Sequence, residues 1–171
     1  EYVLLLEICY KILEKDKSRH INDHDLYEPY RELHGLYYGD GNYSEGDFSE
    51  RMSVLMEKIY SEYQSKFGSE QGVSLNSSEV TELLYKHDVK KLKSTLSAYL
   101  THKDILWLLF DNIDNGWPTS GLQHEDLLMI RTLIDATRKI ERQFSSRDFK
   151  VRSVVFLRND VYELLVRETS D

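Results

Sequence analysis

Two carboxylates follow the most apolar stretch of this chain. Asp111 and Asp114 come just after Ile105–Phe110, ILWLLF, and precede Asn115-Gly116. A run this short and apolar is typical of a strand buried on both faces of a parallel sheet. Its carboxyl end would lie where open α/β sheets bind ligands. Since Mg²⁺ prefers oxygen ligands, Asp111 could hold magnesium through water while Asp114 orients or deprotonates an attacking water.

The same acidic residues also fit an ordinary turn. Asp-Asn and Asp-Asn-Gly sequences are common where a strand ends and the chain changes direction. Four apolar residues followed by Asp are a weak signal, and the second acidic residue strengthens it only modestly. The pattern therefore leaves two interpretations open, a magnesium-binding pair and a turn at the end of a strand.

A second polar group follows a second apolar run. Val154–Leu157 is followed by Arg158, Asn159 and Asp160. The ends of adjacent parallel strands face the same crevice, so a polar group there could sense a γ-phosphate or polarise an attacking water. Alternatively, an Arg–Asp pair closes the strand and Asp160 stabilises the start of the next helix. On the residues alone, this second interpretation is favoured.

Other reactive residues form weaker patterns. His20 and His24 have the i,i+4 spacing of ligands on a zinc-binding helix, but Asp23 looks like a helix start that would leave His20 outside. The sequence contains no HExxH and no GxSxG pattern. Cys9 lies on the apolar face of an expected helix, where a buried structural cysteine is the usual case. A solvated charged segment and a structural thiol are the favoured interpretations.

Composition narrows the class of protein. The 171 residues are 40% hydrophobic and 30% charged, with a formal net charge of −8, which fits one soluble globular domain. The acidic balance argues against non-specific binding to nucleic acid or an anionic membrane. No apolar run approaches the roughly 20 residues that span a bilayer. One cysteine excludes an internal disulfide and a cysteine metal cage, and we expect a cytoplasmic location.

Helical periodicity dominates residues 1–103. Asn22 or Asp23 is expected to cap the second helix, and Gly68 to end a later one. Ser77 or Ser78 is expected to cap the last helix, with a break near His87-Asp88. The expected helices cover residues 3–13, 26–33, 48–67 and 80–100, and the expected loops are Tyr37–Glu45 and Ser69–Ser78.

A strand–helix–strand pattern occupies residues 104–171. Helical spacing covers His124–Phe144, a second strand is expected over Val151–Leu157, and a final helical turn or two over Val161–Arg167. Two buried strands joined by a long helical crossover are expected to be parallel and right-handed. We therefore predict a predominantly helical α/β fold with parallel strands at about 104–111 and 151–158. The chain would be a single partial domain, helical over 1–103 and βαβ over 104–171.

Three segments together resemble a known family. They are Phe110–Trp117, FDNIDNGW; Leu133–Phe144, LIDATRKIERQF; and Val154–Leu165, VVFLRNDVYELL. They resemble bacterial P-loop ATPases of the STAND/AAA+ type, and more closely a family with a DxxDxGW signature followed by an FLRxD strand. The resemblance covers residues 104–171 and is thin over 1–103. Such proteins are large, multidomain and cytoplasmic, and many relatives are associated with defence or signalling.

The resemblance implies roles for individual residues. Asp111 resembles the Walker B carboxylate that holds magnesium, and Asp114 the catalytic acid of the extended Walker B motif. Arg158 occupies the sensor-like position after the next strand, and Trp117 matches the tryptophan of the signature, with packing as its expected role. ATP and Mg²⁺ would be the cofactors of a longer parent, with both strands in the middle of its P-loop sheet.

One element of that family does not occur in the sequence. The phosphate-binding motif GxxxxGK[ST] is absent, and no Gly-Lys-Ser/Thr follows Gly39, Gly41 or Gly46. The motif would lie before Glu1, and without its amides and lysine we expect this chain alone to bind nucleotide poorly or not at all. We expect a sheet edge left unpaired to be covered by the chain's own helices or by self-association.

Two other classes of function stay open. A non-catalytic helical protein-interaction domain is the main alternative, and the tyrosines of Tyr27–Tyr43, which lack interleaved basic residues, fit packing or a protein interface. A metal-dependent nuclease using Asp111, Asp114 and Asp160 is disfavoured by the acidic charge and by the lack of a nearby catalytic lysine pattern. Substitution of Asp111 separates the ATPase from the interaction domain.

Overall fold

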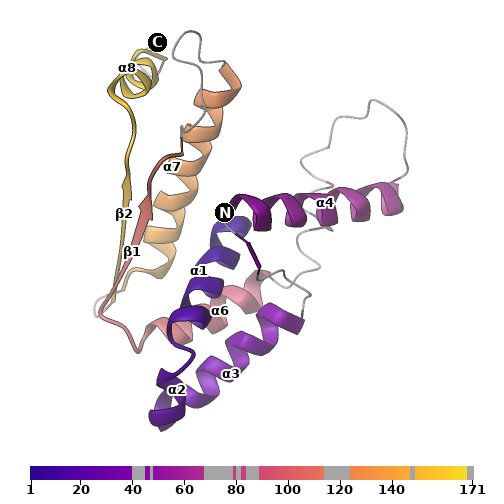
Figure 1. Ribbon diagram of the computed structural model, residues 1–171, viewed down its shortest axis with the longest axis vertical. Helices are drawn as coiled ribbons and strands as arrows, with labels where there is room; N and C mark the ends of the chain where they lie inside the picture. Colours follow the sequence, from indigo (N-terminus) through magenta and orange to yellow (C-terminus); the bar gives the residue numbers. More distant parts are fainter. Residues whose placement is uncertain are drawn as a thin grey trace. The chain divides into compact units, whose positions relative to one another are not determined.

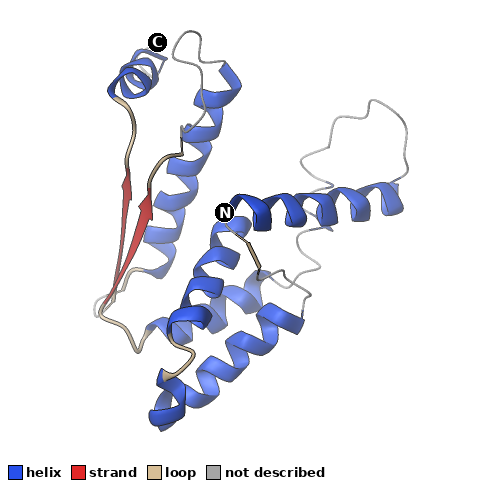
Figure 2. Ribbon diagram, viewed as in Figure 1, coloured by secondary structure: helices blue, strands red, loops and turns tan. Residues whose placement is uncertain are grey.

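The computed structural model describes residues 1–39, 45–46, 48–67, 79, 82–83, 89–113, 124–146 and 149–168. The described chain is mostly helical and contains one sheet of two parallel strands (Figure 2). This confirms the prediction of a predominantly helical α/β fold with parallel strands. The chain divides into two compact units, Tyr2–His102 and Lys103–Asp171, with Glu1 grouped with the latter.

The unit Tyr2–His102 is built from helices. Their bounds are α1 (Tyr2–Lys15), α2 (Arg19–Asn22), α3 (His24–Gly39), α4 (Phe48–Phe67) and α6 (Val89–Leu100). Helix α3 packs against α1, α2 and α6 (Figure 1). The side chains buried most completely between these helices are Leu5, Cys9, Leu33, Leu96 and Tyr99, each 0% exposed. The apolar stripes of α1, α3 and α6 therefore meet in one core, as their periodicity predicts.

A side-chain cap sets the start of α3, and a contact with α1 extends its end. Asp23 has an extended backbone, and its Oδ1 accepts a hydrogen bond from the Asp25 amide at 3.1 Å, which confirms the predicted cap. The far end differs, because a loop is predicted from Tyr37 but α3 continues to Gly39. Tyr37 is 3% exposed and its ring lies 6.3 Å from the ring of Tyr10. Burial of this aromatic ring therefore holds the last turn in the helix.

Several predicted features fall outside the described residues. Helix α4 has the predicted bounds, but the stop at Gly68, the loop Ser69–Ser78 with its serine caps, and the break near His87-Asp88 lie outside that part of the chain. The same holds for Asp114 and for the rest of the signature through Trp117. Those predictions stay predictions.

The unit Lys103–Asp171 is a βαβ arrangement with one further helix. Its elements are β1 (Ile105–Phe110), α7 (His124–Phe144), β2 (Lys150–Val155) and α8 (Asn159–Glu168). The strands pair in parallel from Ile105–Lys150 to Phe110–Val155. Strand β1 and helix α7 have the predicted bounds. Strand β2 begins one residue earlier and ends two residues earlier than predicted. Helix α8 begins two residues early, because Asn159 and Asp160 already have helical backbone.

Among the described residues of this unit, helix α7 covers one face of the sheet and no helix covers the other. Helix α7 packs on β2, where Val151 is 2% exposed and the Ser153 hydroxyl donates to Glu141 Oε1 at 2.7 Å. On the other face, Ile105, Trp107 and Leu109 are 45%, 54% and 64% exposed. The prediction that this strand is buried on both faces is therefore wrong for the described chain. The strand is apolar on both faces, but α7 covers only one of them.

A second apolar cluster lies at the carboxyl end of the strands. Leu127 and Ile130 of α7 pack with Val161 and Leu165 of α8, all nearly inaccessible to solvent. The partly buried Ile113 and Leu157, from the segments that follow β1 and β2, pack against this cluster. The contact fixes α8 beside the amino end of α7 (Figure 1). It also anchors the two chain segments that carry the candidate site.

Among the described residues, no helix is both long and apolar enough to cross a lipid bilayer.

Candidate functional site

Asp111 and Arg158 leave the sheet at the same edge. Phe110 pairs with Val155, and the Phe156 amide donates to the Phe110 carbonyl at 2.8 Å, so the ladder continues to the point where both strands end. Asp111 follows at once on β1, and Arg158 follows two residues after Phe156. The common edge that the sequence predicts for these two residues is confirmed, because the strands are adjacent and parallel.

Asp111 is exposed and forms the first corner after β1. Its Oδ1 accepts a hydrogen bond from the Asn112 amide at 2.9 Å. Asn112 has a φ of 54°, in the left-handed region that asparagine enters more readily than most residues. The predicted turn at the strand end therefore forms. An exposed carboxylate in such a turn still presents an oxygen donor of the kind a hard cation prefers.

Arg158 and Asp160 form a two-point ion pair at the start of α8. The Nε and Nη2 atoms of Arg158 lie 3.2 and 2.6 Å from the two carboxylate oxygens of Asp160. The hydrogen bond from Arg158 is the main reason that the pKa of Asp160 lies below its ordinary value. The strand-closing pair favoured from the sequence therefore forms. The sensor-like role of Arg158 stays a prediction.

The other predicted site residues are not brought to this edge within the described chain. Asp114 and Trp117 lie outside it. His20 belongs to α2 and His24 begins α3, so the two residues do not lie on successive turns of one helix. Among the described residues, no three potential metal ligands lie close enough together to hold an ion. Cys9 is 0% exposed, and burial raises its pKa to about 12, which is typical of a structural thiol.

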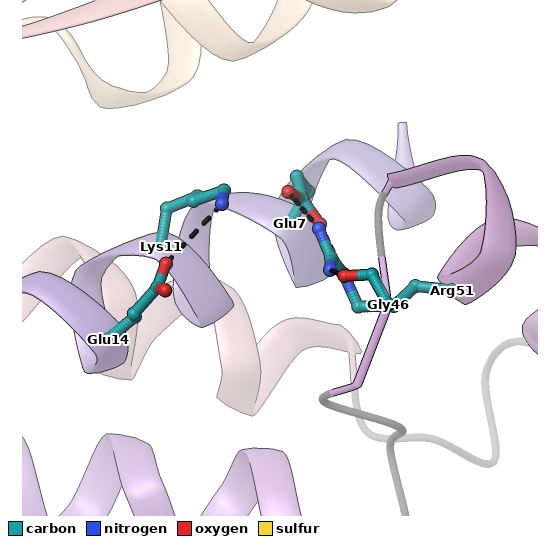
Figure 3. A network of polar contacts seen from close by, with 5 residues as sticks. All are labelled: Glu7, Lys11, Glu14, Gly46 and Arg51. Carbon is teal, nitrogen blue, oxygen red and sulfur yellow. Dashed lines mark hydrogen bonds and ion pairs between the residues drawn. The ribbon is translucent and has the colours of Figure 1, made fainter.

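A buried ion pair that the sequence did not indicate joins α1 to α4. Arg51 is 8% exposed, and its Nη2 and Nε lie 2.6 and 3.1 Å from the two carboxylate oxygens of Glu7 (Figure 3). The guanidinium also donates to the Gly46 carbonyl and lies 4.1 Å from the ring centroid of Tyr10. Gly46 has a φ of 78°, and a Cβ there would meet the side chain of Glu50 at 2.1 Å. The left-handed backbone at this position therefore favours glycine.

A second buried polar contact joins α6 to the end of α1. The hydroxyl of Tyr99, a residue 0% exposed, donates to Asp16 Oδ2 at 2.6 Å. Burial, reinforced by Asp16, raises the pKa of Tyr99 well above its ordinary value. Tyr30 donates to the Leu13 carbonyl at 2.8 Å, and the ring of His20 stacks on it with centroids 4.0 Å apart. The aromatic ring of His20 thus packs in the helical unit.

Comparisons with family models, with curated proteins and with solved structures gave no match to this chain. The resemblance to P-loop ATPases therefore rests on the three segments quoted above. The function that this resemblance implies is therefore a proposal, which is supported by the geometry of the sheet edge.

Proposed function

We propose that the carboxyl edge of the β1–β2 sheet is one half of a magnesium–nucleotide site in an ATP-hydrolysing switch protein. The observation that carries the proposal is the parallel pairing of two strands whose ends lead to Asp111 and Arg158 at one edge. Open parallel sheets bind nucleotides at that edge. A cytoplasmic location, where ATP is available, belongs to the same proposal.

Each side chain has a distinct part in this chemistry. Asp111 is exposed and binds the magnesium ion of ATP through water. Asp114 orients the attacking water, and the positive charge of Arg158 stabilises negative charge on the transferred phosphoryl group. Mg²⁺, when bound, neutralises charge between the phosphates. The residues described here supply an oxygen donor and a cation at one edge, which fits that division of roles.

The site is completed by a phosphate-binding loop outside this sequence. The motif GxxxxGK[ST] does not occur in the 171 residues, so the loop amides and lysine come from another segment of the polypeptide or from another chain. By itself the chain then binds nucleotide weakly. Conformational switching is the use we assign to hydrolysis, because it is the role that the resemblance implies.

The test measures ATP hydrolysis and ATP binding in the polypeptide that joins this sequence to a phosphate-binding loop. Asp111→Asn should lower the rate of hydrolysis by about 100-fold or more while nucleotide still binds, because the amide is a poorer magnesium ligand. Asp104→Asn is the matched control, since Asp104 is exposed just before the amino end of the same strand. Unchanged hydrolysis in Asp111→Asn would show that the Walker B assignment is wrong.

A non-catalytic protein-interaction domain is the second candidate. Exposed apolar side chains on α4 favour it, since Met56 and Tyr60 are 49% and 51% exposed one helical turn apart. The same assay separates the candidates. An interaction domain shows no magnesium-dependent hydrolysis at all, with or without Asp111→Asn.

A further inference from the structure

The face of the sheet opposite α7 has two chemically different rows of side chains. Strand β1 contributes Ile105, Trp107 and Leu109, which are 45%, 54% and 64% exposed. Strand β2 contributes the exposed Lys150 and Arg152 at the paired positions, Ile105–Lys150 and Trp107–Arg152. Residues paired in a sheet point to the same face, and the strands lie about 4.8 Å apart. An apolar row therefore runs directly beside a basic row.

The apolar row is continuous. Its three residues alternate along one strand, the half-buried Val154 pairs with Leu109, and Phe156, the next residue of that parity, is 53% exposed. Single exposed apolar residues are normal on protein surfaces, but a contiguous strip marks a binding surface. Parallel sheets are ordinarily covered on both faces, and helices are the elements that cover them.

The basic row carries charge that this part of the chain leaves uncompensated. Within the described residues, the Arg152 guanidinium has no hydrogen bond and no ion pair. Lys150 Nζ donates at 2.7 Å to the carbonyl of Ser146, which is a neutral acceptor. A chain with a formal net charge of −8 thus presents two cations beside this exposed apolar strip. A partner that covers the strip gains from negative charge along one side.

We propose that this face binds an amphipathic α-helix whose apolar stripe is bordered on one side by acidic residues. The apolar stripe covers Ile105, Trp107 and Leu109, and the carboxylates meet Lys150 and Arg152. A six-residue strand is about 20 Å long, which matches three to four turns of helix. A partner strand would pair at an edge and leave the face open, and an anionic membrane is disfavoured by the overall acidic charge.

The experiment uses the whole chain and synthetic helical peptides as probes. One fluorescent peptide of about five turns carries a leucine stripe with glutamates on one side, and its twin has lysines in place of those glutamates. Fluorescence anisotropy should show that the acidic peptide binds about 10-fold or more tightly than the basic twin. Equal affinity for the two peptides, or binding of neither, overturns the proposal.

Matched variants locate the binding on this face. Leu109→Ser should lower the affinity for the acidic peptide about 10-fold. Leu128→Ser is the control and should not change this affinity, since Leu128 is also exposed (53%) but lies on α7. Arg152→Glu should abolish the preference between the peptides, because Lys150 then faces a neighbouring carboxylate, and Arg131→Glu on the exposed side of α7 should leave the preference unchanged. Because all four positions are exposed, circular dichroism should show the same folded signal in each variant.

Other occupants of the face would give different results. A second copy of the chain would appear as a mass that rises with concentration and returns to the monomer in Leu109→Ser. A lipid surface would appear as Arg152-dependent co-sedimentation with phosphatidylserine vesicles. Either result, without a preference for the acidic peptide, overturns the proposal. None of these variants alters Asp111, so failure here is distinct from failure of the proposed nucleotide site.

Discussion

At the scale of single residues, the unit Tyr2–His102 buries several polar side chains. Each predicts a different effect on stability. Tyr99 and Asp16 are 0% and 6% exposed and share a hydrogen bond of 2.6 Å. Cys9 is equally inaccessible but contributes as an apolar side chain, with its thiol held protonated. The two cases lead to different predictions, one about hydrogen bonding and the other about pH.

Tyr99→Phe should lower the free energy of unfolding by about 1–3 kcal/mol, because it leaves the buried Asp16 carboxylate without its hydroxyl donor. Urea denaturation followed by circular dichroism measures the change. Tyr60→Phe is the control, since Tyr60 is 51% exposed and its hydroxyl is accessible to water. A loss no larger for Tyr99→Phe than for Tyr60→Phe would contradict a structural role for the hydrogen bond.

Ionisation of Cys9 should lower the free energy of unfolding at alkaline pH. In the unfolded chain the thiol ionises near its ordinary value of 9.0, whereas burial in the folded chain raises its pKa to about 12. Ionisation therefore favours the unfolded state, and the contribution is complete below pH 9 and is lost as pH rises toward 12. The difference in the free energy of unfolding between the natural chain and Cys9→Ala should decrease by about 1 kcal/mol between pH 8 and pH 10.

Denaturation of both proteins at several pH values measures that difference. Using the difference removes the effects of tyrosine ionisation, which both chains share. A gap that stays constant with pH would mean that the thiol titrates alike in the folded and unfolded states.

At the scale of elements, α4 is joined to α1 by a buried two-point ion pair. The Arg51 and Glu7 side chains are 7% and 20% exposed, with a closest approach of 2.6 Å. Nearby on α1, the Lys11–Glu14 pair has side chains 52% and 53% exposed at 3.3 Å (Figure 3). Exposed ion pairs contribute little to the free energy of unfolding. Removal of one partner from a buried pair is costly, because it leaves an uncompensated charge inside the protein.

Arg51→Met should therefore lower the free energy of unfolding by about 3 kcal/mol, and Lys11→Met by no more than about 0.5 kcal/mol. The double variant Glu7→Gln/Arg51→Met should be less destabilised than the sum of its two single changes, because no charge is left unpaired. Chemical denaturation of the natural chain and of these four variants measures both effects. Additive losses would show that the two side chains are not coupled.

At the scale of the whole molecule, the chain consists of two compact units, each with its own buried residues. Leu33 in Tyr2–His102 and Ile140 in Lys103–Asp171 are both 0% exposed. Replacing either by alanine creates a cavity that costs about 2–5 kcal/mol. Because stability can differ between cooperative units of one protein, each cavity should affect mainly its own unit.

Hydrogen exchange measured by mass spectrometry tests this. Leu33→Ala should raise exchange in α1, α3 and α6 and leave α7 and β2 unchanged, and Ile140→Ala should do the reverse. Each variant serves as the control for the other. Faster exchange throughout the chain in both variants would show that the two units unfold as one.

Much of the local structure could be predicted from the sequence, because it depends on neighbours along the chain. Helical spacing and an apolar run determine α7 over His124–Phe144 and β1 over Ile105–Phe110. The cap at Asp23 and the turn after Asp111 follow from side chains that bond to the next amides. The position of Asp111 and Arg158 at one sheet edge then followed from the rule for parallel crossovers.

The tertiary structure alone decided which distant residues meet and which surfaces are covered. Glu7 and Arg51 are 44 positions apart, and Asp16 and Tyr99 are 83 apart, so no spacing rule could pair them. The sequence of β1 is apolar on both faces, but only packing in space showed that α7 covers one face and leaves Trp107 on the other. Residue types and their spacing thus determined the elements and the candidate acidic edge, whereas long-range contacts determined the buried ion pair and the open face.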